Sequence, residues 1–285
     1  MNHGKLLKKL RTSRGITQKQ LAEGISSQAA LSRMEQSGNI PSYLLLSFLD
    51  RLDIHPVEFF TLAAENQVLE SQSFLNKMNE TCYNKEKMNE LVNEEITLYK
   101  QTGLKKHKIN SMRVKAIYHK IHDLPLENSK EIAKEITKYL LKFDSWFLND
   151  ISLYSDLLFI FSNDFIKAHH KTVLNSLETL PLGGNQKHIY IVTYTNNTIV
   201  LAFERKNLTD LDFYLNSYKD FLNDNPAFLT DRIYYSIYCQ LQKLMIKFNN
   251  EGYNKLISDL KIFKKYNLDD AYQNMLGFIN SCLDR

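Results

Sequence analysis

The stretch "TQKQLAEGISSQAALSRMEQSG" carries two sets of helix start and stop signals close together. Thr17 can cap a helix while Gln20, three residues later, reaches back to it, which is the capping-box pattern. Gly24 is suited to end that helix. Ser27 is a suitable cap for the next helix, and Gly38 stands where that helix stops. The pattern predicts two short helices joined by a tight turn, the arrangement of a helix-turn-helix.

Three more helices are expected around this pair. Leucines within residues 6–10 give a first helix an apolar stripe. A helix begins at Pro41 in "IPSYLLLSFLDRL". Pro56 opens a fifth helix at its first position, where a missing N–H costs nothing. We therefore expect a compact five-helix domain over residues 1–64.

A helical wheel at 100° per residue separates the faces of the helix that follows Ser27. Leu31 and Met34 must point to the core, with Ala30 and Glu35 on the flanks of the buried face. The four residues expected to face outward are Gln28, Ala29, Ser32 and Arg33. We expect this outward face to lie in the major groove of DNA. There Gln28 would read an adenine edge, Arg33 would reach a guanine or a phosphate, and the methyl of Ala29 could contact a thymine methyl.

Charge is concentrated at the N-terminus. Residues 1–38 hold seven basic and two acidic side chains, a net charge of +5, whereas the whole chain has +4. A basic patch on a nearly neutral body indicates an anionic partner for this segment, and the alternative is a solvated lysine-rich helix face. The basic residues are Lys5, Lys8, Lys9, Arg11, Arg14, Lys19 and Arg33.

The segment "LRTSRGITQKQLAEGISSQAALSRMEQSGNIPS" resembles the phage-repressor (Cro/C1, or XRE) type of DNA-binding domain, over about residues 4–62. The resemblance implies that Arg11 and Glu35 form a structural ion pair and that Gln18 contacts a phosphate. It also implies that the start of the recognition helix reads bases. With the outward face, the predicted DNA-binding residues are Gln18, Lys19, Ser27, Gln28, Ala29, Ser32 and Arg33.

The rest of the chain is predicted to be helical. Only four of the 33 aromatic residues come before residue 65, and glycine and proline are scarce. The β-branched segment "HIYIVTYTNNTIVLAF" could form two strands, but its length and helical neighbours favour a helix. Residues 201–221 align with 246–266 at an offset of 45. Each unit reads as helix, turn and helix, as in tetratricopeptide-like solenoids.

This layout is similar to that of the Rgg/GadR/MutR regulators. The resemblance implies an all-α fold, with a five-helix Cro/C1-type domain over residues 1–64, a helical linker over 65–105 and a TPR-like repeat domain over 106–285. It further implies a homodimeric transcriptional regulator that binds double-stranded DNA and is controlled by a short hydrophobic signalling peptide in the repeats.

Asparagine and aromatic side chains on the groove-lining helices of such repeats are candidates for gripping a peptide. The alternative for most of the tyrosines is core packing or the dimer interface. The predicted peptide-binding residues are Asn163, Tyr194, Asn197, Arg205, Arg232 and Tyr235.

Other functions find little support. No glycine-rich phosphate loop or nucleophile elbow occurs, so we expect no enzyme and no cofactor. The pairs His119/His122 and His169/His170 lack further ligands, so no metal is expected. Two alternatives remain, namely a protein-interaction scaffold and a simple phage- or plasmid-type repressor without a peptide ligand.

The expected location is the cytoplasm. No apolar run reaches the roughly 18 residues that span a bilayer, and the N-terminus lacks the pattern of a signal peptide. Cys82, Cys239 and Cys282 are odd in number and far apart, which fits a reducing compartment better than a disulfide framework.

Overall fold

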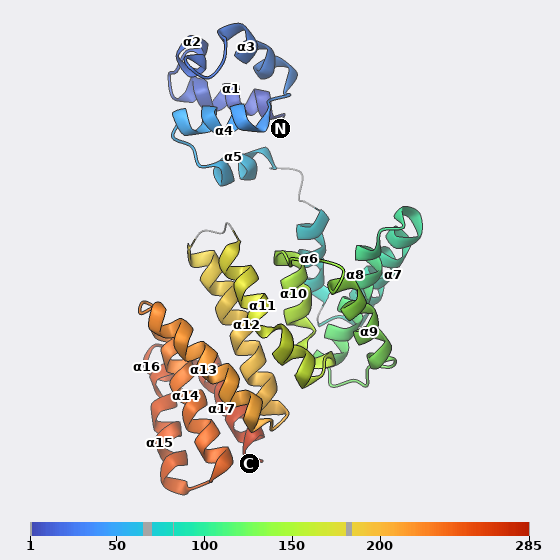
Figure 1. Cartoon of the computed structure of the whole chain (residues 1–285), viewed down its shortest axis with the longest axis vertical. Helices are drawn as coiled ribbons and strands as arrows, with labels where there is room; N and C mark the ends of the chain where they lie inside the picture. Colours follow the sequence, from blue (N-terminus) through green and yellow to red (C-terminus); the bar gives the residue numbers. More distant parts are fainter. Residues whose placement is uncertain (1, 65–69, 82, 181–183, 285) are drawn as a thin grey trace. The chain divides into compact units, whose positions relative to one another are not determined.

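The computed structural model describes residues 2–64, 70–81, 83–180 and 184–284 (Figure 1). The chain divides into two compact units, Met1–Glu80 and Thr81–Arg285. Every regular element in the described part is helical, which confirms the predicted all-α fold.

Five helices form the described part of residues 1–64, as predicted. They are α1 (His3–Ser13), α2 (Gln18–Ala22), α3 (Gln28–Ser37), α4 (Ser42–Arg51) and α5 (Pro56–Ala63), and α6 (Glu70–Thr81) follows them. The predicted caps are confirmed. The Thr17 Oγ1 accepts a hydrogen bond from the Gln20 N–H at 3.2 Å, and the Gln20 Oε1 accepts one from the Thr17 N–H at 2.8 Å.

The turn between α2 and α3 and the end of α3 also match the prediction. The Ser27 Oγ accepts a hydrogen bond from the Ala30 N–H at 3.1 Å. Gly24 and Gly38 have φ of +70° and +85°, in the left-handed region that glycine adopts without a steric penalty. The two helices of the helix-turn-helix are therefore bounded by local interactions within the sequence.

The core of the five-helix domain is formed mainly by leucines, with Phe48, Phe59, Ala22 and Ile54. Leu6 and Leu7 of α1, Leu21 of α2 and Leu31 of α3 are almost completely buried. Phe48 of α4 joins them in one cluster. α1 and α2 both pack against α3, so the third helix is held on two sides while its remaining face stays open.

A close approach of α1 to α3 occurs at Gly4. A Cβ at this position would lie 2.2 Å from the Met34 carbonyl oxygen and 3.0 Å from that of Glu35. These are main-chain atoms near the end of α3, so they can move away only if the helices separate. The sequence pattern gave no indication of this contact.

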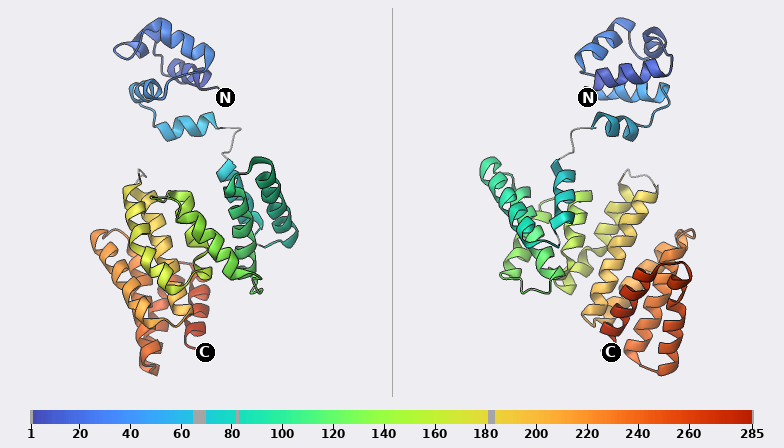
Figure 2. Two further views of the ribbon diagram at one scale, coloured as in Figure 1. Left: turned by 45° about the vertical axis from the view of Figure 1, so that its right-hand side comes forward. Right: turned by 180° about the vertical axis from the view of Figure 1, so that it is seen from behind.

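The second unit contains the remaining helices. Its elements are α7 (Lys85–Thr102), α8 (Lys105–Ile121), α9 (Ser129–Leu140), α10 (Leu148–Asp156), the 3-10 turn η1 (Leu158–Ile160), α11 (Asn163–Thr179), α12 (Gly184–Glu204), α13 (Leu208–Asp224), α14 (Leu229–Ile246), α15 (Asn250–Leu260), α16 (Ile262–Lys265) and α17 (Asp269–Cys282). Successive helices from α11 to α15 pack on one another (Figure 2).

The ambiguous β-branched segment is part of the long helix α12, as predicted. Its buried residues recur at helical spacing and are Ile191, Tyr194, Thr195, Thr198, Ile199, Leu201, Ala202 and Phe203. Packing between α11 and α13 buries this face and outweighs the strand preference of isoleucine, valine and threonine.

The repeat at an offset of 45 corresponds to equivalent core positions in α13 and in the α15–α16 region. Leu211 and Leu256 are both fully buried, and the pairs Leu215/Leu260 and Tyr218/Phe263 are also in the core. The fourth pair differs, because Phe203 is buried whereas Phe248 is 44% exposed.

The predicted linker, residues 65–105, has a packed second half. α7 packs against α8, and its Met88 and Leu91 are buried. Residues 65–69 of this linker and Cys82 lie outside the described residues.

We predict that Gly4→Ala lowers the free energy of unfolding of the first unit by about 1–3 kcal/mol, the usual range for overpacking. Alanine is the better helix former by up to about 1 kcal/mol, so the steric contact must outweigh that gain. Gly277→Ala in α17 is the control, since a Cβ there meets nothing within 4 Å. Calorimetry should show a lower first-unit transition for Gly4→Ala only, and unchanged stability would contradict the close approach.

Candidate functional site

The outward face of α3 is the candidate DNA-reading surface. Ser27, Gln28, Ala29 and Arg33 are exposed, while Ser32 is half-buried. Leu31 is buried in the core, as the helical wheel predicted, whereas Met34 is only half-buried and Glu35, predicted on a flank, is 3% exposed. The hydroxyl of Ser27 is also the cap of α3.

A buried ion pair fixes α3 against α1. The Arg11 guanidinium donates from Nε to Glu35 Oε1 at 2.6 Å and from Nη2 to Glu35 Oε2 at 3.0 Å. Its Nη1 donates to the Ile16 carbonyl oxygen at 2.7 Å, in the connection that leads to α2. The arrangement is bidentate, which is the strongest form of an arginine–carboxylate contact. It confirms the structural pair that the resemblance implied.

Gln18 completes this buried network. Its Nε2 donates to Glu35 Oε2 at 2.8 Å, so α1, α2 and α3 meet at one carboxylate. Burial alone would raise the pKa of Glu35, but hydrogen bonds from Arg11 and Gln18 and the charge of Arg11 together hold it below its ordinary value of 4.5. The amide of Gln18 thus has a partner inside the domain. Its predicted phosphate contact would have to use another group or a different rotamer.

A second brace, from Arg51 in α4, was not anticipated. Its Nη1 donates to the carbonyl oxygens of Gln20 at 3.3 Å and Leu21 at 3.2 Å, and it also contacts that of Glu23. These are carbonyls at the end of α2 that have no intrahelical partner. Since the residues are about 30 positions apart, no local pattern in the sequence could have revealed the contact.

The six predicted peptide-binding residues differ in their surroundings. Asn163 and Arg205 do meet, with Arg205 Nη1 donating to Asn163 Oδ1 at 2.6 Å. Tyr194 is 1% exposed, and its hydroxyl lies 3.2 Å from the ring nitrogen Nδ1 of His170 in the core. Asn197 is exposed elsewhere on α12. We propose no direct ligand contact for Tyr194.

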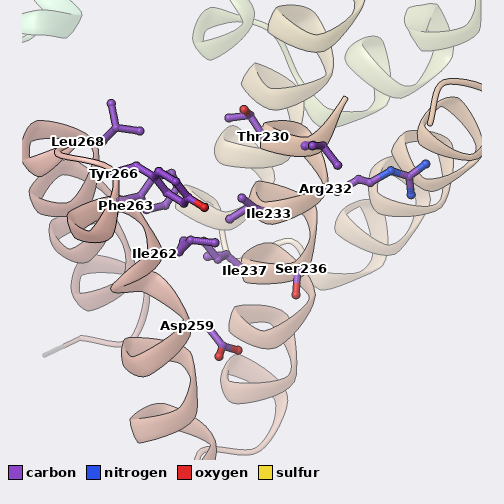
Figure 3. A pocket seen from close by; sticks show the side chains of 11 residues that line it. Thr230, Arg232, Ile233, Ser236, Ile237, Asp259, Ile262, Phe263, Tyr266 and Leu268 are labelled. Carbon is purple, nitrogen blue, oxygen red and sulfur yellow. The ribbon is translucent and has the colours of Figure 1, made fainter. Parts of the chain in front are cut away.

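The remaining two predicted residues lie on α14. Arg232 lines a hollow between α14 and the α15–α16 region, although its guanidinium donates to the Leu222 carbonyl oxygen and points away from the hollow (Figure 3). Tyr235 is half-buried against Tyr218. Burial and the nearby Cys239 raise the pKa of Tyr235 to about 12, so its phenol is uncharged at neutral pH.

The α14 hollow has a volume of about 710 Å³, within the range of small-ligand pockets. Ile233 and Ile237 of α14 face Ile262 and Phe263 across it (Figure 3). The polar groups of its lining include Thr230, Ser236 and Asp259. Four large apolar side chains with a few hydroxyls can accommodate apolar peptide side chains and bind a peptide main chain.

Other classes of site are not seen in the described part of the chain. No group of three or more histidine, cysteine or acidic residues there could hold a metal ion. No helix among those residues is long and apolar enough to cross a membrane.

Comparison with known proteins places this architecture in a family. The sequence profile described as "HTH-type transcriptional regulator Rgg, C-terminal domain" matches residues 85–274, and a helix-turn-helix profile matches residues 7–59. A search by sequence among curated proteins found no match.

Solved structures show the same fold. A putative transcriptional regulator from Listeria monocytogenes EGD-e is 18% identical, with 99% of this chain and 97% of that chain covered and a TM-score of 0.82. The SHP pheromone receptor Rgg2 of Streptococcus dysgalactiae is 18% identical, with coverages of 98% and 99% and a TM-score of 0.75. A PrgX/iCF10 complex is 16% identical, with coverages of 99% and 89% and a TM-score of 0.75.

The protein is thus a helix-turn-helix regulator with a C-terminal helical domain. The chain belongs to the Rgg family of HTH-type transcriptional regulators, because the Rgg C-terminal profile alone matches well over half of it. The expected family is confirmed.

We predict that Glu35→Gln destabilises the first unit by about 3 kcal/mol at pH 7, since it leaves the Arg11 charge buried without its counter-ion. The folded pKa of Glu35 is depressed, so its contribution is present above the unfolded value and is lost as the pH falls through the folded value. The difference between wild type and variant should therefore shrink below about pH 4.5. Glu23→Gln, at an exposed position, should change little in the same unfolding titrations. A difference that does not depend on pH would contradict this account.

Proposed function

We propose that this protein is a homodimeric, cytoplasmic, sequence-specific DNA-binding regulator whose activity is set by a short hydrophobic peptide bound to the second unit. The observation that carries the proposal is the exposed first turn of α3 on a rigidly braced helix-turn-helix, in a chain of the Rgg family.

The DNA-binding part of the proposal rests on the face of α3 and on charge. Gln28 would donate to and accept from an adenine edge, the Ala29 methyl would contact a thymine methyl, and Arg33 would reach a guanine or a phosphate. The exposed lysines of the first unit would neutralise phosphates and make affinity depend on salt. They are Lys5, Lys8, Lys9 and Lys19.

Dimerisation would make up for the few base-reading groups on each subunit. Two copies of α3 would enter major grooves roughly 34 Å apart on one face of the duplex. Each subunit would then contribute the same short set of contacts to a half-site, and the phosphate contacts would supply much of the affinity.

The peptide-binding part rests on the α14 hollow and on relatives. Rgg2 is described as a pheromone receptor, and PrgX has been solved as a complex with iCF10. In this chain the hollow offers the exposed Leu229, Tyr266 and Leu268 to apolar side chains. A peptide that favours one arrangement of the dimer by only about 1–3 kcal/mol would change DNA affinity substantially.

We predict that Gln28→Ala weakens specific DNA binding by about 1–3 kcal/mol and leaves binding to random DNA unchanged, because it removes a base contact and no charge. Gln36→Ala is the control, since this exposed glutamine lies two turns further along α3 and away from the end that enters the groove. Fluorescence anisotropy with operator and scrambled duplexes measures the affinity of each variant for specific and for random DNA. An equal loss on the two duplexes would show that Gln28 does not read bases.

We predict that Ser236→Trp abolishes binding of hydrophobic peptides, because an indole from this exposed serine on α14 would occupy the hollow. Ser258→Trp places the same indole at an exposed position on α15 outside the hollow and should have no effect. The measurement is anisotropy of labelled peptides encoded beside the gene, titrated with the full-length protein. Absence of micromolar binding to the wild type would favour a simple repressor or a scaffold instead.

A further inference from the structure

A second basic segment lies in the second unit. Residues 100–142 hold eleven basic and four acidic side chains, a net charge of +7, although the whole chain has only +4. Among the described residues, ion pairs join Lys108 to Glu135, Arg113 to Asp156 and Lys120 to Glu204. A further group of these lysines lies on and just after α9.

Four lysines form a row along one side of α9. Lys130, Lys134 and Lys138 lie on the helix, and Lys142 follows just after its end. Residues four apart share a helix face, so successive lysines are about 6 Å apart along the axis. All four are exposed, and none takes part in an ion pair formed among the described residues.

The row borders a hollow of about 700 Å³ between α9 and the start of α11. Its apolar lining comes from Ala133, Leu141, Ile160, Phe161 and Phe165. Ser162, the N-cap of α11, also lines it, and the start of a helix carries partial positive charge. The exposed carboxylate of Asp164 lies in the same turn and offsets this partial charge. The hollow therefore combines an apolar floor with a row of positive charge on its α9 side.

The end of the row carries positive charge in excess. Interaction with the neighbouring Lys105 lowers the pKa of Lys142 below its ordinary value, and the charge of Glu135 only partly offsets this effect. Two ammonium groups that approach each other on the surface create a local demand for an anion.

We infer that the α9–α11 hollow binds an extended peptide segment in which acidic and apolar residues alternate. In an extended chain, side chains two residues apart point the same way and lie about 6.6–6.8 Å apart. This spacing matches the lysine row, so every second residue can place a carboxylate at one lysine. The intervening residues then face the apolar floor.

A peptide fits this surface better than a nucleic acid does. Proteins bind single-stranded nucleic acids by stacking the bases on the open faces of aromatic side chains. Phe161 is only 4% exposed, and the ring of Phe165 packs against those of Phe161 and His169 at centroid distances of 5.1 and 4.1 Å. These rings can provide an apolar floor but no open face for a base.

The site is separate from the α14 hollow, and the two have no lining residue in common. The inference therefore does not depend on the proposed hydrophobic signalling peptide. It assigns to the second unit a further partner of different chemistry, an acidic segment of another polypeptide.

The test titrates a short fluorescein-labelled peptide of alternating glutamate and leucine with the full-length protein. Binding is measured by the fluorescence anisotropy of the peptide. Lys134→Gln/Lys138→Gln should weaken binding roughly three- to thirtyfold, from the usual strength of two exposed charge pairs. Lys243→Gln/Lys255→Gln removes the same charge from exposed positions outside the hollow and should change it less than about twofold. Leu141→Ser should also weaken binding, because Leu141 is exposed and contributes to the floor.

Four outcomes would overturn the inference. They are no binding of the peptide, an equal loss in the control variant, equal binding of a glutamate–serine peptide, and tighter lysine-dependent binding of a single-stranded oligonucleotide. Ser236→Trp should leave the binding of this acidic peptide intact, so failure here is distinguishable from failure of the proposed signalling site.

Discussion

The Glu35 carboxylate is the point on which the first unit depends. It is 3% exposed and accepts hydrogen bonds from Arg11 of α1 and Gln18 of α2. Removing a charged group from water costs several kcal/mol, so the pair is maintained only because its geometry is bidentate and its remaining lone pairs are used. The result is a recognition helix whose rotation relative to α1 and α2 is fixed, which leaves Gln28, Ala29 and Arg33 directed outward.

The second unit separates two kinds of chemistry along one helical array. The α14 hollow is apolar with hydroxyls in its lining, whereas the α9–α11 hollow is apolar with a row of lysines. Both lie beside a continuous aromatic and aliphatic core. An array of this kind can bind ligands of different charge without rearranging its core, because each hollow uses side chains from neighbouring helices only.

The sequence predicted those features that local patterns encode. Capping boxes, left-handed glycines and helical periodicity gave the five N-terminal helices, the buried and exposed faces of α3, and the helical state of the β-branched α12. Contacts between distant positions were missed, such as Arg51 on the end of α2 and Gly4 against α3. The burial of Tyr194, one of the six predicted peptide-binding residues, was missed for the same reason, because it depends on neighbouring helices that are distant in the sequence.

The charge distribution of the second unit was also only partly predicted from the sequence. The sum over residues 39–285 is close to zero and suggested a neutral body, yet it conceals the net charge of +7 within residues 100–142. Periodicity within α9 then places four of those lysines on one side. Such a row could have been found from the sequence by examining charge in windows, whereas the apolar hollow beside it depends on α11 and becomes visible only in three dimensions.

The central claim is that the buried pair holds α3 in place while the outward side chains do the reading. A double-mutant cycle with Arg11→Ala and Glu35→Ala, measured both on unfolding of the first unit and on the ratio of specific to non-specific DNA affinity, tests it most directly. The account predicts that each single change costs about 3–5 kcal/mol of stability, that the double change costs far less than their sum, and that the affinity ratio of the folded protein is unchanged. Additive stability effects, or a lower affinity ratio with stability intact, would contradict it.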